Sequence, residues 1–143
     1  MIILDVNILI YAVNRDAPLH RKAKHWLEAT LTGGETFGLS WSVVLAFLRL
    51  TTRPGLFSKP LPVATAFEIV ESWIEQPAIT LVHPGPAHFQ TLRDLLLSSG
   101  TGGNLTQDAH LAALAIENNA TLCSSDADFA RFPRVARTNP LTQ

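Results

Sequence analysis

The chain of 143 residues contains a single cysteine, Cys123, so no disulfide can form within it. Charge is also scarce, because 16% of the residues are Asp, Glu, Lys or Arg while 47% are hydrophobic. Such a composition favours a sheet that is covered on both faces, with some apolar surface left for an oligomer interface. Since Cys123 stands in an apolar run, we expect it to be a buried packing residue rather than a reactive one.

The sequence also lacks a hydrophobic run of the length that a membrane helix needs. Its longest stretch free of Asp, Glu, Lys and Arg runs from Gln76 to Leu92, and three prolines and two histidines interrupt it. The amino terminus shows strand residues in place of a basic region followed by an apolar segment. We therefore expect no secretory signal and a cytoplasmic protein.

Neither sign of charge is in excess, and the formal net charge of -1 argues against a nonspecific nucleic-acid binder, which is usually strongly basic. Basic residues nevertheless gather in three groups: Arg15, Arg21, Lys22 and Lys24; Arg49, Arg53 and Lys59; and Arg131, Arg134 and Arg137. Beside an acidic metal centre such groups would suit a phosphodiester substrate. Ordinary solvated faces explain each group alone at least as well.

The common nucleotide-binding and nucleophile motifs are missing. The sequence has no G-x-x-x-x-G-K-[ST], G-x-G-x-x-G or G-x-S-x-G, and the loop from Gly100 to Gly103 has no Lys to hold a phosphate. The five histidines include no pair spaced four residues apart, so we expect all of them to be structural or surface residues rather than zinc ligands. Nucleotide switching and serine hydrolysis are therefore excluded.

Strand-like and helix-like segments alternate, which favours right-handed crossovers and an α/β fold around a parallel sheet. The expected strands are residues 2–4, 36–40, 79–82 and 120–124, and a fifth near Val135 has a weak signal. The expected helices are residues 19–31, a segment ending before Pro54, segments around Val70 and Leu95, a segment through Glu117 and a short one at 129–132. With no linker or repeat, we expect a single domain over residues 1–143.

Capping residues and apolar spacing give further expectations for these helices. Ser42 is expected to cap the second helix and Thr106 the fifth, while Asp128 would cap the short helix and leave Asp126 free. The inner faces of the second, third and fourth helices are expected to carry Val43, Ala46, Phe47 and Leu50; Phe67, Val70 and Ile74; and Phe89, Leu92, Leu95 and Leu96.

Three acidic residues stand where strands end or a helix begins. Asp5 follows the first strand, Asp108 lies in the first turn of a helix, and Asp126 follows the fourth strand, while Asn7 can share the edge with Asp5. Each acid alone is adequately explained as a capping or dipole-stabilising residue. Together they come from elements that a doubly wound sheet brings to one edge, where ligands bind. Their mutual repulsion would be relieved by Mg²⁺ or Mn²⁺, whereas zinc normally needs His or Cys.

Three segments then resemble the PIN-domain family and its VapC toxins: ILDVNILI at 3–10, GNLTQDAHLAALA at 103–115 and SSDADFARFP at 124–133. The resemblance runs on to residues 139–141 and so covers essentially the whole chain. It implies a three-layer α/β/α sandwich with a mostly parallel sheet of four or five strands, and endoribonuclease activity that depends on Mg²⁺ or Mn²⁺. It also implies a homodimer, a cognate VapB-type antitoxin and an RNA substrate such as tRNA or rRNA.

The site residues follow from the same resemblance, position by position. It makes Asp5, Asp108 and Asp126 the catalytic and metal-binding acids, with Asn7, Ser125 and Asp128 in support. One position departs from the family, because Ala46 stands where much of the family places a Glu in the helix after the second strand. We favour natural divergence, since Ala46 to Arg49 resembles this helix in one branch of the toxins. An engineered inactivating change is the alternative, and the natural gene would decide between the two.

Metal-assisted hydrolysis of RNA is therefore the favoured hypothesis. Arg49 and Arg53, one helical turn apart, could contact RNA phosphates or acidic groups of the antitoxin. Ala46 keeps an alternative open, a catalytically silent PIN-like module that binds antitoxin or RNA without cleavage. A receiver-type signalling domain and a haloacid-dehalogenase-type phosphatase fit less well. Both need a late Lys that the segment after Asp126 lacks, and the phosphatase would also need an Asp where Asn7 stands.

Overall fold

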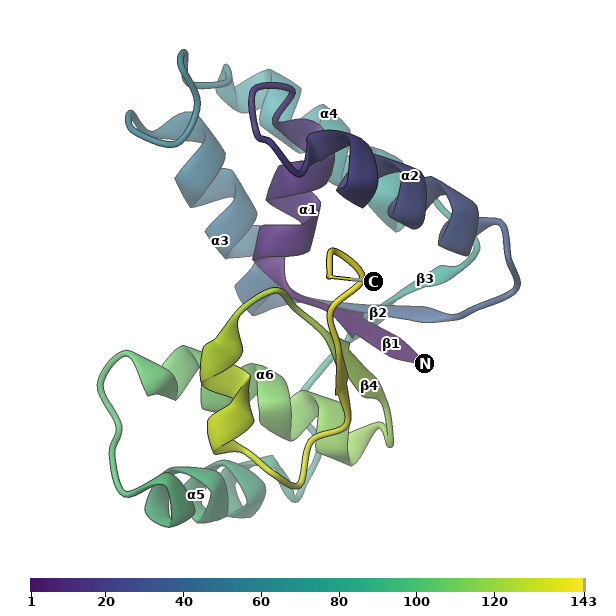
Figure 1. Cartoon of the computed structure of the whole chain (residues 1–143). Coiled ribbons are helices and arrows are strands. Elements are labelled where there is room, and N and C mark those ends of the chain that lie inside the picture. The colour runs from purple at the N-terminus through teal and green to yellow at the C-terminus, as the bar shows by residue number, and fades with distance from the viewer. Residues whose placement is uncertain (143) are drawn as a thin grey trace.

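The computed structural model describes residues 1–142, in which five parallel strands form one sheet (Figure 1). The elements in chain order are β1 (Ile2–Leu4), α1 (Val6–Val13), α2 (His20–Leu31), β2 (Phe37–Ser40), α3 (Trp41–Thr52), α4 (Val63–Ile74), β3 (Ile79–Val82), α5 (His88–Ser99), α6 (Leu105–Glu117), β4 (Thr121–Cys123), the 3-10 helix η1 (Ala127–Arg131) and β5 (Arg137–Thr138). The predicted α/β class is confirmed, and the fifth strand lies just beyond Val135.

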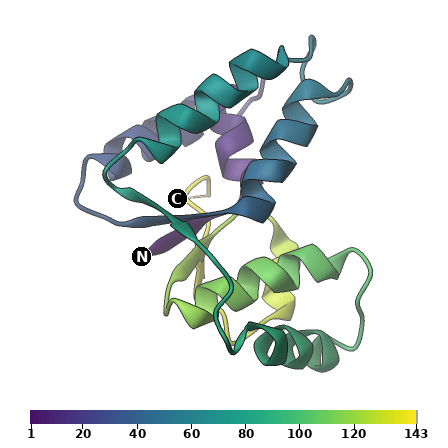
Figure 2. The same ribbon diagram turned by 180° about the vertical axis from the view of Figure 1, so that it is seen from behind.

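Helices cover both faces of the sheet, which gives the three layers that the resemblance implied. Helices α1 to α4 lie on one face, and α5, α6 and η1 lie on the other, as the front and back views both show (Figures 1 and 2). The three inner strands β1, β2 and β4 are mostly buried, with Ile3, Leu4, Phe37 and Leu122 all without exposed surface. Within residues 1–142, none of the helices is long and apolar enough to cross a membrane.

Strand order decides which residues meet at the functional edge. The order is β3-β2-β1-β4-β5, so β1 is central and pairs with both β2 and β4. Leu4 is opposite Cys123 in the register of β1 and β4. Because the strands are parallel, the residues that follow Leu4 and Cys123 leave the sheet side by side. The chain order therefore brings Asp5 next to Ser124.

Two predicted helix starts were wrong. Helix α3 follows β2 without a loop, so Ser40 rather than Ser42 is its N-cap, and the Ser40 hydroxyl oxygen accepts a hydrogen bond from the Val43 amide at 3.2 Å. Helix α6 begins at Leu105, which places Thr106 inside the first turn, and no side chain caps its start. Helix α1, which starts directly after Asp5, was not predicted because its nearly continuous apolar residues show no helical period.

The buried faces of α4 and α5 also differ from those predicted. Helix α4 buries Ala66, Val70 and Trp73, whereas Phe67 and Ile74 are exposed. Trp73 is drawn inward because its ring packs edge-on against Phe47 of α3, at 4.8 Å between ring centroids. Helix α5 buries Leu95 as predicted and also His88, while Phe89 is 77% exposed. On α3, Val43 and Phe47 are buried as predicted, whereas Ala46 and Leu50 are half-buried.

Candidate functional site

Asp5 occupies the point where the central strand becomes a helix. It is the N-cap of α1, and its Oδ1 accepts a hydrogen bond from the Val6 amide at 2.8 Å. Its Oδ2 accepts a 2.6 Å hydrogen bond from the Ser124 hydroxyl. Burial raises the pKa of Asp5, although the hydrogen bonds from Ser124 and Val6 lower it in part. The carboxylate is thus buried and held in one orientation from both oxygens.

Ser124 connects the ends of β1 and β4. Besides donating to Asp5, its hydroxyl oxygen accepts from the Asn7 side-chain amide at 3.3 Å and from the Asp126 backbone amide at 2.9 Å. Asn7 Oδ1 accepts in turn from the Ser125 backbone amide at 3.3 Å. Sequence reasoning singled out Asn7 and Ser125 and missed Ser124. The only sequence signal for Ser124 was that two serines, rather than one, follow the fourth strand.

Asp126 and Asp128 exchange the roles that the sequence predicted. Asp126 is the N-cap of η1, and its Oδ1 accepts a hydrogen bond from the Asp128 amide at 2.9 Å. Asp128 lies in the first turn and is exposed. The prediction that Asp128 caps and Asp126 is free was wrong, because the helical turn begins at Ala127 rather than at Phe129.

Asp108 joins these two acids from the first turn of α6, on the same face of the sheet as η1. Single carboxylate oxygens of Asp108, Asp126 and Asp128 lie within 4.8 Å of one another. Burial, followed by the charges of Asp126, Asp5 and Asp128, raises the pKa of Asp108 to about 6. Asp5 is outside this group of three but close enough for the charge of Asp126 to raise its own pKa. The sheet edge therefore gathers four carboxylates that repel one another.

The chemistry of these donors suits a hard divalent cation. Each of the three clustered residues offers a carboxylate oxygen, and neither His nor Cys belongs to the cluster. Mg²⁺ and Mn²⁺ prefer such oxygen ligands, and their positive charge would offset the repulsion that raises the pKa of Asp108. Asp108, Asp126 and Asp128 fit a metal ion, with Asp5 beside them.

A pocket of about 710 Å³ opens next to the acids, between α3 and α6. Asp5 and Asp108 form part of its wall, and Ala46 and Arg49 of α3 line it together with apolar residues that include the exposed Leu45. Position 46 thus faces the same space as two of the acids. Arg53, at the C-terminal end of α3, is exposed and does not line this pocket.

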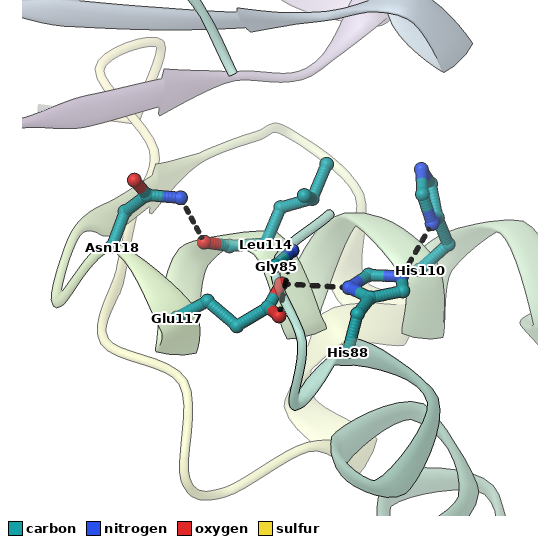
Figure 3. A network of polar contacts seen from close by, with 6 residues as sticks. All are labelled: Gly85, His88, His110, Leu114, Glu117 and Asn118. Atoms are coloured by element: carbon teal, nitrogen blue, oxygen red, sulfur yellow. Dashed lines mark hydrogen bonds and ion pairs between the residues drawn. The ribbon is translucent and has the colours of Figure 1, made fainter. Parts of the chain in front are cut away.

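Two of the histidines, neither of which lines the pocket, form a polar network (Figure 3). His88 of α5 lies between Glu117 and His110 of α6, with its Nδ1 2.7 Å from Glu117 Oε2 and its Nε2 2.9 Å from His110 Nδ1. A carboxylate only accepts, so His88 Nδ1 donates to Glu117, and in the neutral ring its Nε2 accepts from His110. Burial, reinforced by His88, lowers the pKa of His110. Glu117 Oε1 also accepts from the Gly85 amide at 3.2 Å, which ties the loop before α5 to α6.

Replacing His88 by Ala is expected to destabilise the protein by about 2 kcal/mol, because it leaves His110 Nδ1 and Oε2 of the half-buried Glu117 without their partner. Urea unfolding would measure the change. The matched control is His83→Ala, since His83 is exposed and has no side-chain partner within residues 1–142. An equal effect of both substitutions would show that the network does not stabilise the packing of α5 on α6.

Comparison with known proteins places the chain among similar sequences and folds. The PIN domain matches residues 2–135. Two ribonucleases of Mycobacterium tuberculosis are similar over nearly their full lengths: Ribonuclease VapC37 is 44% identical over 98% of this chain and 97% of its own, and Ribonuclease VapC33 is 41% identical over 100% of both. Among solved structures, VapBC2 from Rickettsia felis, bound to a DNA fragment from its promoter, has a chain with a TM-score of 0.72 and 22% identity over 97% of this chain and 98% of its own.

Proposed function

The chain belongs to the PIN-domain family and to its VapC branch, and from that premise we propose that it is the toxin of a toxin–antitoxin pair, an endoribonuclease that hydrolyses RNA with a divalent metal ion. The observation that carries the proposal is the meeting of Asp5, Asp108, Asp126 and Asp128 at one sheet edge beside a pocket. The names of the similar mycobacterial ribonucleases support the reaction class.

The roles of the residues follow from their surroundings. Asp108, Asp126 and Asp128, with Asp5 alongside, would hold Mg²⁺ or Mn²⁺. When bound, such an ion activates water and stabilises negative charge on phosphate oxygens. Asn7 and Ser124 fix the orientation of Asp5 and of the segment that carries Asp126. Arg49, which lines the pocket, would contact an RNA phosphate or an acidic group of the antitoxin.

Partners are part of the proposal. A VapB-type antitoxin would cover the pocket, whose walls combine apolar residues with Arg49. Likeness of the fold to a chain of a VapBC complex supports this partner. A second copy of the chain would cover exposed apolar side chains such as Phe89 and Leu97 of α5. Size-exclusion chromatography with light scattering tests for this homodimer: the mass of two chains is expected, and the mass of a single chain would contradict it.

A second candidate function is a catalytically silent module that binds RNA or antitoxin. The observation that favours it is Ala46, which gives the pocket a methyl group where much of the family has a carboxylate. Both candidates need the same fold and the same partners, so cleavage alone separates them.

The test is incubation of the purified chain with total RNA and a tRNA panel, with Mg²⁺ or Mn²⁺ and with EDTA. We expect fragments with either ion and none with EDTA. RNA binding without fragments under all conditions would favour the silent module. Neither binding nor cleavage of RNA by the folded protein would contradict the nuclease and would leave, of the two functions, only a module that binds the antitoxin.

Metal binding is also expected to appear in the melting temperature. A cation at one hundred times its dissociation constant stabilises the folded state by about 2.7 kcal/mol, so saturating Mn²⁺ should raise the melting temperature by several degrees at pH 7.5. Protons compete with the ion at Asp108, whose pKa is about 6. The rise should therefore shrink markedly at pH 5. Differential scanning fluorimetry measures it, and a rise that is equal at both pH values would exclude Asp108 as a ligand.

A further inference from the structure

A second, smaller pocket lies on the other side of the acidic cluster. Its volume is about 360 Å³, and the ends of β4 and β5 and the start of η1 form its walls: Ser124, Ser125, Asp126, Ala127, Phe129, Arg137, Thr138 and Asn139. The larger pocket lies toward β2, because α3 starts directly at the end of that strand. The smaller pocket lies toward β5, at the opposite edge of the sheet. The acids stand between the two.

Three hydrogen-bond donors in this second pocket have no partner within residues 1–142. They are the Ser125 hydroxyl, the Arg137 guanidinium and the side-chain NH₂ of Asn139. Asn139 Oδ1 accepts from the Leu141 amide at 3.0 Å, which fixes the side chain and leaves its NH₂ available. A cation and two neutral donors around one hollow suit the oxygens of a phosphate and its sugar.

The other residues of the pocket argue for a backbone site rather than a base site. Phe129 is the only aromatic residue in the walls, and it is 1% exposed, so its ring offers no face on which a base could stack. Asp126 is the one acid in the walls, and by itself it would repel a phosphate. A metal ion bound to the acids would remove that repulsion, and Arg137 supplies positive charge from the other side.

We propose that this pocket binds the phosphate and ribose of the RNA nucleotide on one flank of the cleaved bond, with Arg137 contacting the phosphate. The inference rests on the proposed ribonuclease function and deepens it. The RNA strand then crosses the sheet edge from the α3 side to the β5 side, with Arg49 on one flank of the acids and Arg137 on the other.

The decisive comparison is between Arg137→Ala and Arg93→Ala. Arg93 lies on α5, is exposed and has no partner within residues 1–142. Its substitution therefore removes one positive charge, as Arg137→Ala does, but outside the proposed site. We expect Arg137→Ala to raise the KM for a cleaved RNA about tenfold, to leave kcat nearly unchanged and to lower the salt dependence of RNA binding by about one phosphate contact. Arg93→Ala should match the parent.

Substrate length gives a sharper version of the test. Once the cleavage site is mapped, RNAs shortened from either end can be compared at the same site. Shortening on one flank should abolish the effect of Arg137→Ala and leave that of Arg49→Ala, whereas shortening on the other flank should do the reverse. Unchanged melting temperatures and metal-induced shifts would show that the variants keep the fold and the metal site.

The outcomes separate this inference from the proposed function. If the parent cleaves RNA and Arg137→Ala has the KM and salt dependence of Arg93→Ala, then Arg137 is an ordinary charged residue on an edge strand and the subsite is wrong. If the folded, metal-loaded parent neither binds nor cleaves RNA, the proposed function fails and the subsite fails with it. A fall in kcat alone would also overturn the subsite, because it would place Arg137 in the chemical step.

Discussion

Asp108→Asn is expected to lower RNA cleavage by a factor of about 100 or more and, at the same time, to make the metal-free protein more stable. Both effects have one cause. Burial and the charges of three neighbouring acids disfavour the ionised Asp108, as its pKa of about 6 indicates. Asn keeps the size and removes the charge, so it relieves the repulsion in the absence of metal and also removes a carboxylate that we propose as a metal ligand. The gain in stability should be about 1–2 kcal/mol, after allowance for solvent screening at this half-buried side chain.

The stability gain of Asp108→Asn depends on pH because the pKa of Asp108 is raised in the folded protein. The folded state holds the Asp108 proton up to its raised pKa of about 6, whereas an unfolded chain releases that proton near the ordinary Asp pKa of 3.8. The stability that Asp108 contributes is therefore fully present below 3.8 and is lost as the pH rises through 6. The advantage of Asp108→Asn should be small at pH 4 and should reach its full size above pH 7.

Thermal unfolding in EDTA at several pH values, with a parallel cleavage assay, checks both halves of this prediction. Glu71→Gln is the matched control, because Glu71 is an exposed carboxylate on α4 far from the site in sequence and layer. A stability gain without loss of cleavage would show that Asp108 is not needed for the reaction. Loss of both stability and cleavage would show that Asp108 supports the fold rather than the chemistry.

Much of this site could be predicted from the sequence because it depends on strand order rather than on fine packing. Asp5 follows the central strand and Asp126 closely follows the strand beside it, so a parallel sheet brings them together whatever the helices do. The resemblance to the PIN-domain family added Asp128 as a supporting acid. It also drew attention to Ala46, which lines the pocket next to two of the acids.

The features that sequence reasoning missed depend on small shifts and distant pairs. Moving the start of η1 by two residues exchanges the roles of Asp126 and Asp128. Ser124 and Ser125 are chemically alike, and only the fold reveals which hydroxyl reaches Asp5. His88 contacts residues 22 and 29 positions away, so no local pattern indicates its network. The apolar pattern also placed Phe89 on the buried face of α5, whereas its neighbour His88 is the residue that is buried there.

Ala46→Glu is the second prediction with a large expected effect, because it would place a fifth carboxylate in the space that Asp5 and Asp108 already share. Without metal, the added charge should lower stability by about 1–2 kcal/mol through repulsion and partial burial, with Arg49 one turn away as a partial counter-charge. With metal, the same charge should tighten binding of Mn²⁺ at least about tenfold, since another oxygen ligand becomes available. The sign of the effect on the melting temperature should therefore reverse between EDTA and Mn²⁺.

Ala46→Gln separates charge from size in this experiment, because Gln has the shape of Glu and cannot bind a cation as strongly. Mn²⁺ titration by calorimetry, thermal unfolding with and without the ion, and RNA cleavage should be measured for both variants and the parent. If Glu and Gln behave alike, position 46 does not face the ion, and the four aspartates form the complete set of acids. If only Ala46→Glu cleaves RNA, the missing carboxylate at position 46 is what makes the parent inactive. If the parent cleaves as fast as Ala46→Glu, the aspartates suffice, and the absence of a Glu from α3 is a tolerated divergence within a working nuclease.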